Sequence, residues 1–124
     1  MNQKSYAIKK VSVVIPAKDE QENIGMVLDD LNKVIKDIKN DFQVIIVNDH
    51  SSDQTEKIAQ SKGAVVINNA GPGGKGNALR VGFKVSDGDV IVMMDADYSH
   101  RPEDLPFFLE KIEKGAGLVI GSRI

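Results

Sequence analysis

The strict alternation of short apolar runs with helix-like segments is the feature that most constrains the fold of this chain. Five runs are rich in β-branched residues and almost continuously apolar, which is typical of strands buried on both faces of a parallel sheet. They cover residues 11–15, 43–47, 64–67, 89–93 and 118–120. A segment with the pattern of a helix follows each of the first four runs.

The helices are indicated by apolar periodicity and by residues typical of helix ends. Apolar residues recur every three or four positions from Ile24 to Ile38, with Lys and Asp between them. Asp53 and Glu56 look like the N-cap pair of a second helix, which Gly63 ends. The four helices are expected at residues 24–38, 53–62 and 77–85, and from Pro102 onward.

This alternation predicts the doubly wound α/β class, a mostly parallel sheet of about five strands with helices on both faces. Residues 1–124 are expected to form a single domain, because no repeat or low-complexity tract divides them. The chain has no cysteine and therefore no disulfide. A chain of this length can bury a core without one. In this class, ligands bind outside the carboxyl ends of the strands, where the strand order reverses.

The charge balance and the hydropathy exclude several partners. The chain carries 16 basic and 18 acidic side chains, so its net charge of −2 gives no attraction to nucleic acid. No apolar run approaches the ~20 residues that a membrane-spanning helix needs, and residues 1–10 lack the apolar centre of a secretory signal. We therefore expect a cytoplasmic protein with no nucleic-acid partner and no transmembrane segment in this chain.

Polar segments follow every expected strand directly. They cover residues 16–20, 48–53, 68–76, 95–100 and 121–123. Any one of them alone is explained by turn and cap chemistry. Because parallel strands bring their carboxyl ends to one edge of a sheet, the five segments together predict a binding site at that edge.

The sequence Asp95-Ala96-Asp97 carries the sharpest chemical signal. Two carboxylates separated by one residue, just past a strand, can hold a hard divalent cation such as Mg²⁺ or Mn²⁺, which then bridges phosphate oxygens. The alternative interpretation is a solvated acidic turn, with Asp97 capping the next helix. A calcium-binding loop is excluded, because the sixth position counted from Asp95 is His100 and not Gly.

The glycine-rich stretch at residues 71–76 fits the G-x-G-x-x-G pattern of dinucleotide-binding loops. Against this reading, the stretch does not follow its strand directly and does not lie in the first βα turn. A Walker A loop is excluded, because Lys75 is followed by Gly76 and not by Ser or Thr. The remaining interpretations are a loop that presents Lys75 and backbone N–H groups to an anion, and a plain surface connection.

Four further residues have both a functional and a structural interpretation. Asp49 could accept hydrogen bonds from a base or a ribose, or belong to an Asx turn. Asp53 is interpreted as a helix cap in preference to a ligand. His100 is a loop residue or a catalyst near the carboxylate pair, and Arg123 is a phosphate contact or an exposed terminal residue.

Taken together, these motifs resemble those of the family 2 glycosyltransferases, which have the GT-A nucleotide-sugar fold. The matching segments are residues 13–20 with Asn23 and Ile24, residues 47–55, residues 74–78, residues 94–97 with Pro102 and Glu103, and residues 121–123. Within the family, the last two are most similar to the branch of dolichyl-phosphate mannose synthases and polyprenyl-phosphate glycosyltransferases.

The resemblance implies an inverting, metal-dependent transfer of a sugar from GDP-mannose or a UDP-sugar to a polyprenyl or dolichyl phosphate, with peripheral contact at the cytoplasmic face of a membrane. The residues that it implies for the donor site are Pro16, Ala17, Lys18, Glu20, Asn48, Asp49, Lys75, Asp95, Ala96 and Asp97. Asp95 and Asp97 would hold Mg²⁺ or Mn²⁺ on the diphosphate. They would act in catalysis with Arg123, which would contact a phosphate of the donor or the acceptor.

The sequence departs from the family pattern at a few positions. Lys18 and Asp19 stand where Tyr-Asn is usual, Asn48 stands where a first Asp is usual, and Ser99 stands where some relatives have a metal-binding Gln. No residue is a convincing general base. That fits an acceptor phosphate, which is already ionised, or a base beyond Ile124.

The chain stops one residue after Arg123, where relatives continue into acceptor-side elements. We therefore expect it to be the N-terminal, donor-binding part of a longer enzyme. Two other functions stay open from the sequence. One is a truncated, non-catalytic nucleotide-binding module, and the other is an NAD-dependent oxidoreductase.

Overall fold

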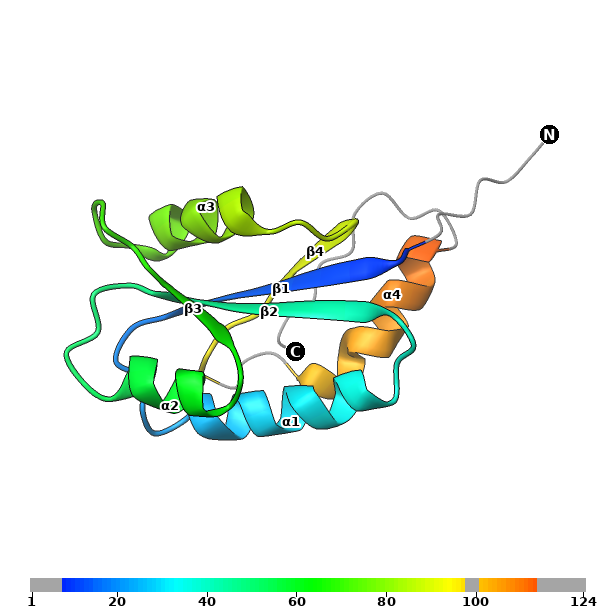
Figure 1. Ribbon diagram of the computed structural model, residues 1–124, viewed down its shortest axis with the longest axis horizontal. Helices are drawn as coiled ribbons and strands as arrows, with labels where there is room; N and C mark the ends of the chain where they lie inside the picture. Colours follow the sequence, from blue (N-terminus) through cyan, green and yellow to red (C-terminus); the bar gives the residue numbers. More distant parts are fainter. Residues whose placement is uncertain (1–7, 98–100, 114–124) are drawn as a thin grey trace.

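The computed structural model describes residues 8–97 and 101–113, which form a parallel β-sheet between two layers of helices (Figure 1). The expected α/β class is confirmed. The elements in chain order are β1 (Lys10–Ala17), α1 (Ile24–Lys36), β2 (Asp41–Asn48), α2 (Thr55–Ser61), β3 (Val65–Asn68), α3 (Lys75–Val85), β4 (Val90–Met93), the 3₁₀ turn η1 (Pro102–Asp104) and α4 (Leu105–Glu113). The fifth expected strand, residues 118–120, lies outside the described residues.

The strands lie in the order β3-β2-β1-β4, and every neighbouring pair is parallel. The register aligns Ala17 with Asn48 and Asn48 with Asn68, so β1, β2 and β3 end at the same level. The chain first steps from β1 to β2 to β3 and then places β4 on the other side of β1. The strand order therefore reverses between β1 and β4, where this fold class binds ligands.

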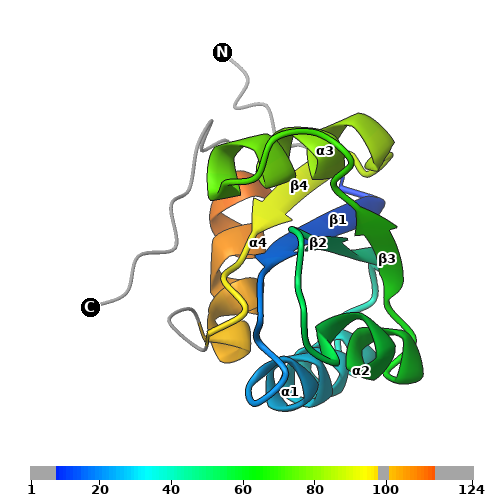
Figure 2. The same ribbon diagram turned by 90° about the vertical axis from the view of Figure 1, so that its left-hand side faces the viewer.

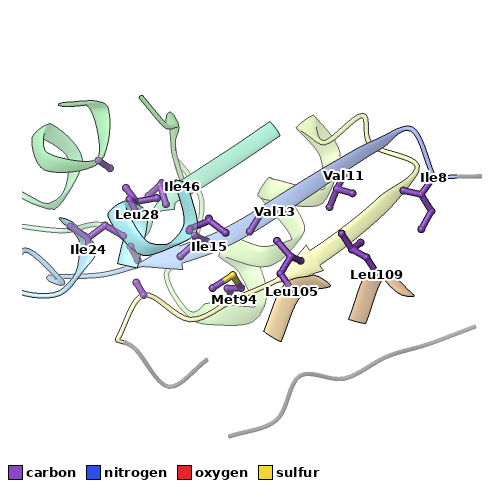
Figure 3. Close-up of a cluster of buried hydrophobic side chains, with 14 residues drawn as sticks. Ile8, Val11, Val13, Ile15, Ile24, Leu28, Ile46, Met94, Leu105 and Leu109 are labelled. Carbon is purple, nitrogen blue, oxygen red and sulfur yellow. The ribbon is translucent and has the colours of Figure 1, made fainter. Parts of the chain in front are cut away.

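Helices cover both faces of the sheet, as expected. Figure 2 looks onto the carboxyl ends of the strands and shows α3 on one side of the sheet and α1 and α2 on the other. Residues of α4 join the cluster on the α1 side (Figure 3). In β1, Val13 and Ile15 face this cluster, while Val14 faces α3. Alternate side chains of β1 are thus buried on opposite faces, which is why the sequence of this strand is apolar throughout.

The expectation that every strand is buried on both faces is wrong for β3 and β4. Val65 in β3 is 52% exposed and Met93 in β4 is 51% exposed. These strands are the two edges of the sheet that the described residues form, so each is covered less completely than β1 and β2.

Glycine lets α3 lie directly on the sheet. A Cβ atom added to Gly82 would overlap the side chain of Val14 and lie 3.0 Å from Cγ2 of Val47. Glycine in a helix costs conformational entropy. Here it allows the helix backbone to approach β1 and β2 closely.

The helix ends differ in detail from the sequence predictions. The first helix ends at Lys36, two residues early, and α3 begins at Lys75, two residues early. Gly63 has a φ of +84°, in keeping with its expected role after α2. Within residues 8–97 and 101–113, no helix combines the length and apolar character that crossing a membrane requires.

Candidate functional site

The segments that follow β1, β2, β3 and β4 meet at the carboxyl edge of the sheet, as the sequence predicts (Figure 2). The fifth predicted segment, which contains Arg123, lies outside the described residues, and so do Ser99 and His100.

Asp19 joins the loop after β1 to the loop after β2. Its backbone N–H donates to Oγ of Ser51 at 3.0 Å, and its Oδ1 accepts from the N–H of Ser52 at 2.7 Å. Asp19 has a φ of +51°, a conformation in which Asp and Asn are several-fold enriched among non-glycine residues. Lys18 and Asp19 stand where the family usually has Tyr-Asn. Of these two residues, Asp19 fixes the loop, whereas the side chain of Lys18 is exposed.

A second set of hydrogen bonds extends the same loop junction. The N–H of Glu20 donates to Oγ1 of Thr55 at 2.8 Å, and the N–H of Gln21 donates to Oδ2 of Asp53 at 3.2 Å. The other oxygen of Asp53 accepts from the backbone N–H of Thr55 at 2.9 Å. Desolvation raises the pKa of Asp53, but hydrogen bonds, first those from Thr55, lower it by more, so the pKa lies below its ordinary value.

The predicted N-cap pair of Asp53 and Glu56 is wrong, because the N-cap residue of α2 is Gln54. Asp53 lies one residue earlier and accepts from the N–H of Thr55, the first residue of α2, while Glu56 accepts a hydrogen bond from Nδ2 of Asn68 at 3.4 Å. Asn68 ends β3, which pairs with β2. The side chain of Glu56 therefore turns toward the sheet edge.

Asn48 is buried and uses its amide as both donor and acceptor. Its Nδ2 donates to Oδ1 of Asn68 at 2.9 Å, and its Oδ1 accepts from the N–H of Ser51 at 3.3 Å. A carboxylate has no donor for Asn68. The replacement of the usual Asp by Asn at this position therefore suits its neighbour on β3.

Asp49 is a buried carboxylate, 5% exposed, that holds the glycine-rich loop. Its Oδ1 accepts from Nδ2 of Asn69 at 3.1 Å, and its Oδ2 accepts from the N–H of Gly74 at 2.9 Å. Burial raises the pKa of Asp49, but the hydrogen bonds from Asn69 and Gly74 oppose it, helped by the charges of His50 and Lys18. The pKa consequently lies below its ordinary value of 3.8, and the group is ionised at neutral pH.

Asn69 is the site residue that sequence reasoning missed. It is also 5% exposed, and its Nδ2 donates to the carbonyl of Pro72 at 2.9 Å as well as to Asp49. Its Oδ1 accepts from the N–H of Gly71 at 3.0 Å. The sequence offered one signal, the position of Asn69 just after a strand, and many loop residues share that signal.

His50 supports the same loop from the outside. Its ring Nε2 lies 2.8 Å from the carbonyl oxygen of Gly71, so this nitrogen carries the proton and donates it. His50 has a φ of +62°, which turns its exposed side chain toward the glycine-rich loop. Neither role was visible in the sequence.

Lys75 and Asp95 form an ion pair across the carboxyl edge of the sheet. Lys75 is the first residue of α3, and Asp95 follows β4 by two positions. The side chain of Asp95 is 23% exposed and that of Lys75 is 61% exposed, so an exposed ammonium pairs with a partly buried carboxylate. Ala96 is buried and Asp97 is exposed, while Pro16 and Ala17 end β1, the neighbouring strand.

The carboxylates of Asp95 and Asp97 are the predicted metal ligands. Among the residues that the structure describes, no cluster of three or more His, Cys, Asp or Glu side chains could hold a metal ion. A metal at this edge would thus take at most two carboxylates from these residues, and its other ligands would come from water or a bound ligand.

Comparison with known proteins gives a consistent family. The model of the family described as "Glycosyl transferase family 2" matches residues 12–124. A dolichol-phosphate mannosyltransferase of Pyrococcus furiosus is 38% identical over 118 aligned positions, and the match covers 92% of this chain and 33% of the relative. An undecaprenyl-phosphate 4-deoxy-4-formamido-L-arabinose transferase of Proteus mirabilis is 32% identical over 124 aligned positions, and the match covers 94% of this chain and 37% of the relative.

Solved structures agree on the fold. The glucosyl-3-phosphoglycerate synthase of Mycobacterium tuberculosis, in complex with Mn²⁺, UDP and glucosyl-3-phosphoglycerate, superposes with a TM-score of 0.76 at 30% identity. The match covers 89% of this chain and 42% of that one. The mannosyl-3-phosphoglycerate synthase of Rubrobacter xylanophilus gives a TM-score of 0.67 at 27% identity, over 72% of this chain and 31% of that one. The chain thus spans about a third of the length of the curated relatives and up to about two fifths of these two structures.

Proposed function

Because the chain belongs to glycosyl transferase family 2, we propose that it is the donor-binding part of an inverting glycosyltransferase that uses a nucleotide diphosphate sugar and a divalent metal. The observation that carries this proposal is the ion pair of Lys75 and Asp95, at the edge where the strand order reverses. A basic group on a glycine-rich loop and a carboxylate after a strand face each other there. Basic groups bind phosphate oxygens and carboxylates bind hard divalent cations, so the two groups together suit a metal–diphosphate unit.

The nucleotide pocket of this proposal lies along the ends of β1 and β2. Its residues are Pro16, Ala17, Lys18, Glu20, Asn48 and Asp49. Asn48 would supply its second amide hydrogen to a base or ribose oxygen, because within the described part of the chain its amide donates only to Asn68. Both carboxylate oxygens of Asp49 already accept hydrogen bonds, so we assign it mainly to shaping the pocket.

Asp95 and Asp97 fit a hard divalent cation in their chemistry. Both offer carboxylate oxygens, and the partly buried Asp95 already has a cationic partner in Lys75. A bound Mg²⁺ or Mn²⁺ would neutralise the negative charge that grows on the leaving diphosphate. A related structure crystallised with Mn²⁺ and UDP supports this assignment.

The residues of the chain would contribute mainly orientation and charge. Lys75 would move its ammonium from Asp95 to a diphosphate oxygen, and the N–H groups at the start of α3 would favour an anion there. We assign Arg123 a contact to a donor or acceptor phosphate. An ionised acceptor phosphate attacks without prior loss of a proton, so this reaction needs no general base.

The acceptor of the proposal is a polyprenyl or dolichyl phosphate at the cytoplasmic face of a membrane. The names of the relatives from P. furiosus and P. mirabilis support a lipid phosphate of this kind. We propose GDP-mannose or a UDP-sugar as the donor, since one of these relatives is named for mannose transfer and the crystallised synthase holds UDP.

Isothermal titration with GDP and with UDP, each with and without Mn²⁺, tests the proposal. We expect one of the two nucleotides to bind, and to bind more tightly with the metal. A folded sample that binds neither, with or without metal, would overturn it. Binding without sugar transfer to a polyprenyl phosphate would select a non-catalytic module, and enhanced NADH fluorescence would select an oxidoreductase.

A further inference from the structure

We propose that Asn69 is a positioning residue for the donor diphosphate. Through Asp49 it fixes the glycine-rich loop, residues 71–76, so that Lys75 stands at the carboxyl edge of the sheet. This inference rests on the proposed function, which places a diphosphate near Lys75. It adds a residue that does not itself touch the ligand.

Asn69 uses every hydrogen-bonding group of its side chain within the site. Its two amide hydrogens go to Asp49 and to the carbonyl of Pro72, and its oxygen accepts from the N–H of Gly71. Its backbone N–H donates to the carbonyl of Asn48 at 3.0 Å, which ties it to the end of β2. Asn69 therefore connects the sheet to the first two residues of the loop.

Asp49 carries this connection to the other end of the loop. Its second oxygen accepts from the N–H of Gly74, the residue that immediately precedes Lys75. Gly74 has a φ of +115°, which side-chain-bearing residues rarely adopt, and its carbonyl accepts the first α3 hydrogen bond from Ala78 at 3.0 Å. The position of Gly74 thus determines where α3 begins and where Lys75 is held.

An asparagine is the residue type that this place requires. An Asp at position 69 would have no hydrogen to give to Pro72 and would set a second carboxylate against Asp49. An Ala would leave Oδ1 of Asp49 without its buried donor and would release Gly71. In either case the loop loses hydrogen bonds that Asn69 makes and keeps those from Gly74 to Asp49 and from His50 to Gly71. The middle of α3 stays packed through Gly82 on Val14.

The effect of losing Asn69 is therefore expected to be local. We expect Asn69→Ala to weaken binding of the nucleotide diphosphate about tenfold. This factor corresponds to the loss of one hydrogen bond to a charged group, here the bond from Asn69 to the carboxylate of Asp49. The matched control is Asn40→Ala. Asn40 is partly buried, and its amide, like that of Asn69, donates to a backbone carbonyl, here that of Ile8 at the amino end of the sheet. This control should leave nucleotide affinity unchanged.

A double-mutant cycle tests whether Asn69 acts through Lys75. The four proteins are the wild type, Asn69→Ala, Lys75→Met and the double variant, each titrated with GDP or UDP and Mn²⁺. If the inference is right, Asn69→Ala weakens binding in the wild type but changes it by less than about twofold once Lys75 is Met. An equal loss in both backgrounds would overturn it.

Amide hydrogen exchange separates this inference from the proposed function, because it needs no ligand. In the free protein, Asn69→Ala should speed exchange at Gly71 and Gly74 and leave the amides in the middle of α3 unchanged. If the wild type binds no nucleotide, the proposed function fails, and the exchange rates still decide whether Asn69 holds the loop. Unchanged exchange at Gly74 would overturn the inference whatever the titrations show.

Discussion

The ammonium of Lys75 pairs with the carboxylate of Asp95, joining the first residue of α3 to the segment after β4. A cation bound to Asp95 and the ammonium of Lys75 would therefore compete for the same group.

Lys75→Met should raise the affinity for Mn²⁺ alone and lower the affinity for the nucleotide diphosphate. Removing the competing ammonium should tighten Mn²⁺ about two- to fivefold, the strength of a partly exposed ion pair. Titration of Mn²⁺ followed by electron paramagnetic resonance measures the first effect, and calorimetry measures the second. Lys62→Met is the control. It breaks a similar ion pair, in which Nζ of Lys62 lies 3.0 Å from Oδ1 of Asp29, at a place remote from the site. Unchanged Mn²⁺ binding in Lys75→Met would contradict the assignment of the metal to Asp95.

Asp95→Asn should abolish the dependence of nucleotide binding on Mn²⁺. An amide is a weaker ligand for a hard cation than a carboxylate, and it does not pair with Lys75. Sugar transfer should fall about 10²-fold or more, because charge stabilisation in the transition state is lost. The control Asp29→Asn, on α1, should retain both properties. If Asp95→Asn kept the full dependence on Mn²⁺, the metal would have to bind at residues other than Asp95.

Asp49→Asn should destabilise the protein at neutral pH and flatten the acid limb of its stability profile. The pKa of Asp49 is lower in the folded protein than its ordinary value of 3.8, so the group stabilises the fold above that pH. This contribution is lost as the pH falls below about 3.8 and through the folded pKa. Urea unfolding between about pH 7 and pH 3 measures it.

Part of the pH dependence of stability should remain in Asp49→Asn. Asp53 and Asp89 also have lowered pKa values, which favour the folded state above the same pH. Asp41→Asn, at an exposed position at the start of β2, serves as the control. Parallel pH profiles for the wild type and Asp49→Asn would show that Asp49 does not contribute in this way.

Gly82→Ala and Gly76→Ala should have opposite effects although both residues lie in α3. A Cβ at position 82 would overlap Val14, and such overpacking costs about 1–3 kcal/mol of unfolding free energy. A Cβ at position 76 would meet no heavy atom within 4 Å, so alanine should stabilise the helix by up to about 1 kcal/mol. Chemical denaturation of both variants measures the difference. Equal stabilities would mean that α3 does not pack closely on the sheet.

Much of the fold was predictable because its signals are local. The apolar runs at residues 11–15 and 43–47 fall inside β1 and β2, and the periodicity after Ile24 falls in α1. Such patterns depend on residues only a few positions apart, and they reflect which faces must be buried. The edge strands were predicted with the right positions and the wrong burial. The order of the strands in the sheet could not be predicted from the sequence pattern of any single strand.

The candidate site was predictable in its place and its charged residues, but not in its internal contacts. The motifs around Asp49, Lys75 and Asp95 were visible as residue types that follow strands. The roles of Asn69 and Asp19 were not, because each depends on a partner 20 or more positions away in the sequence, Asp49 for Asn69 and Ser51 for Asp19.

The sequence by itself determined the α/β class, the family and the edge of the sheet at which the polar segments gather, since alternation and motif order are local properties. Only the tertiary structure decided that Asn69 and Asp49 hold the glycine-rich loop and that Lys75 faces Asp95. Those contacts depend on how parallel strands align and on where β4 enters the sheet. Hydrogen bonds and ion pairs form only over a few ångströms, so such partners become apparent when the fold brings their loops together.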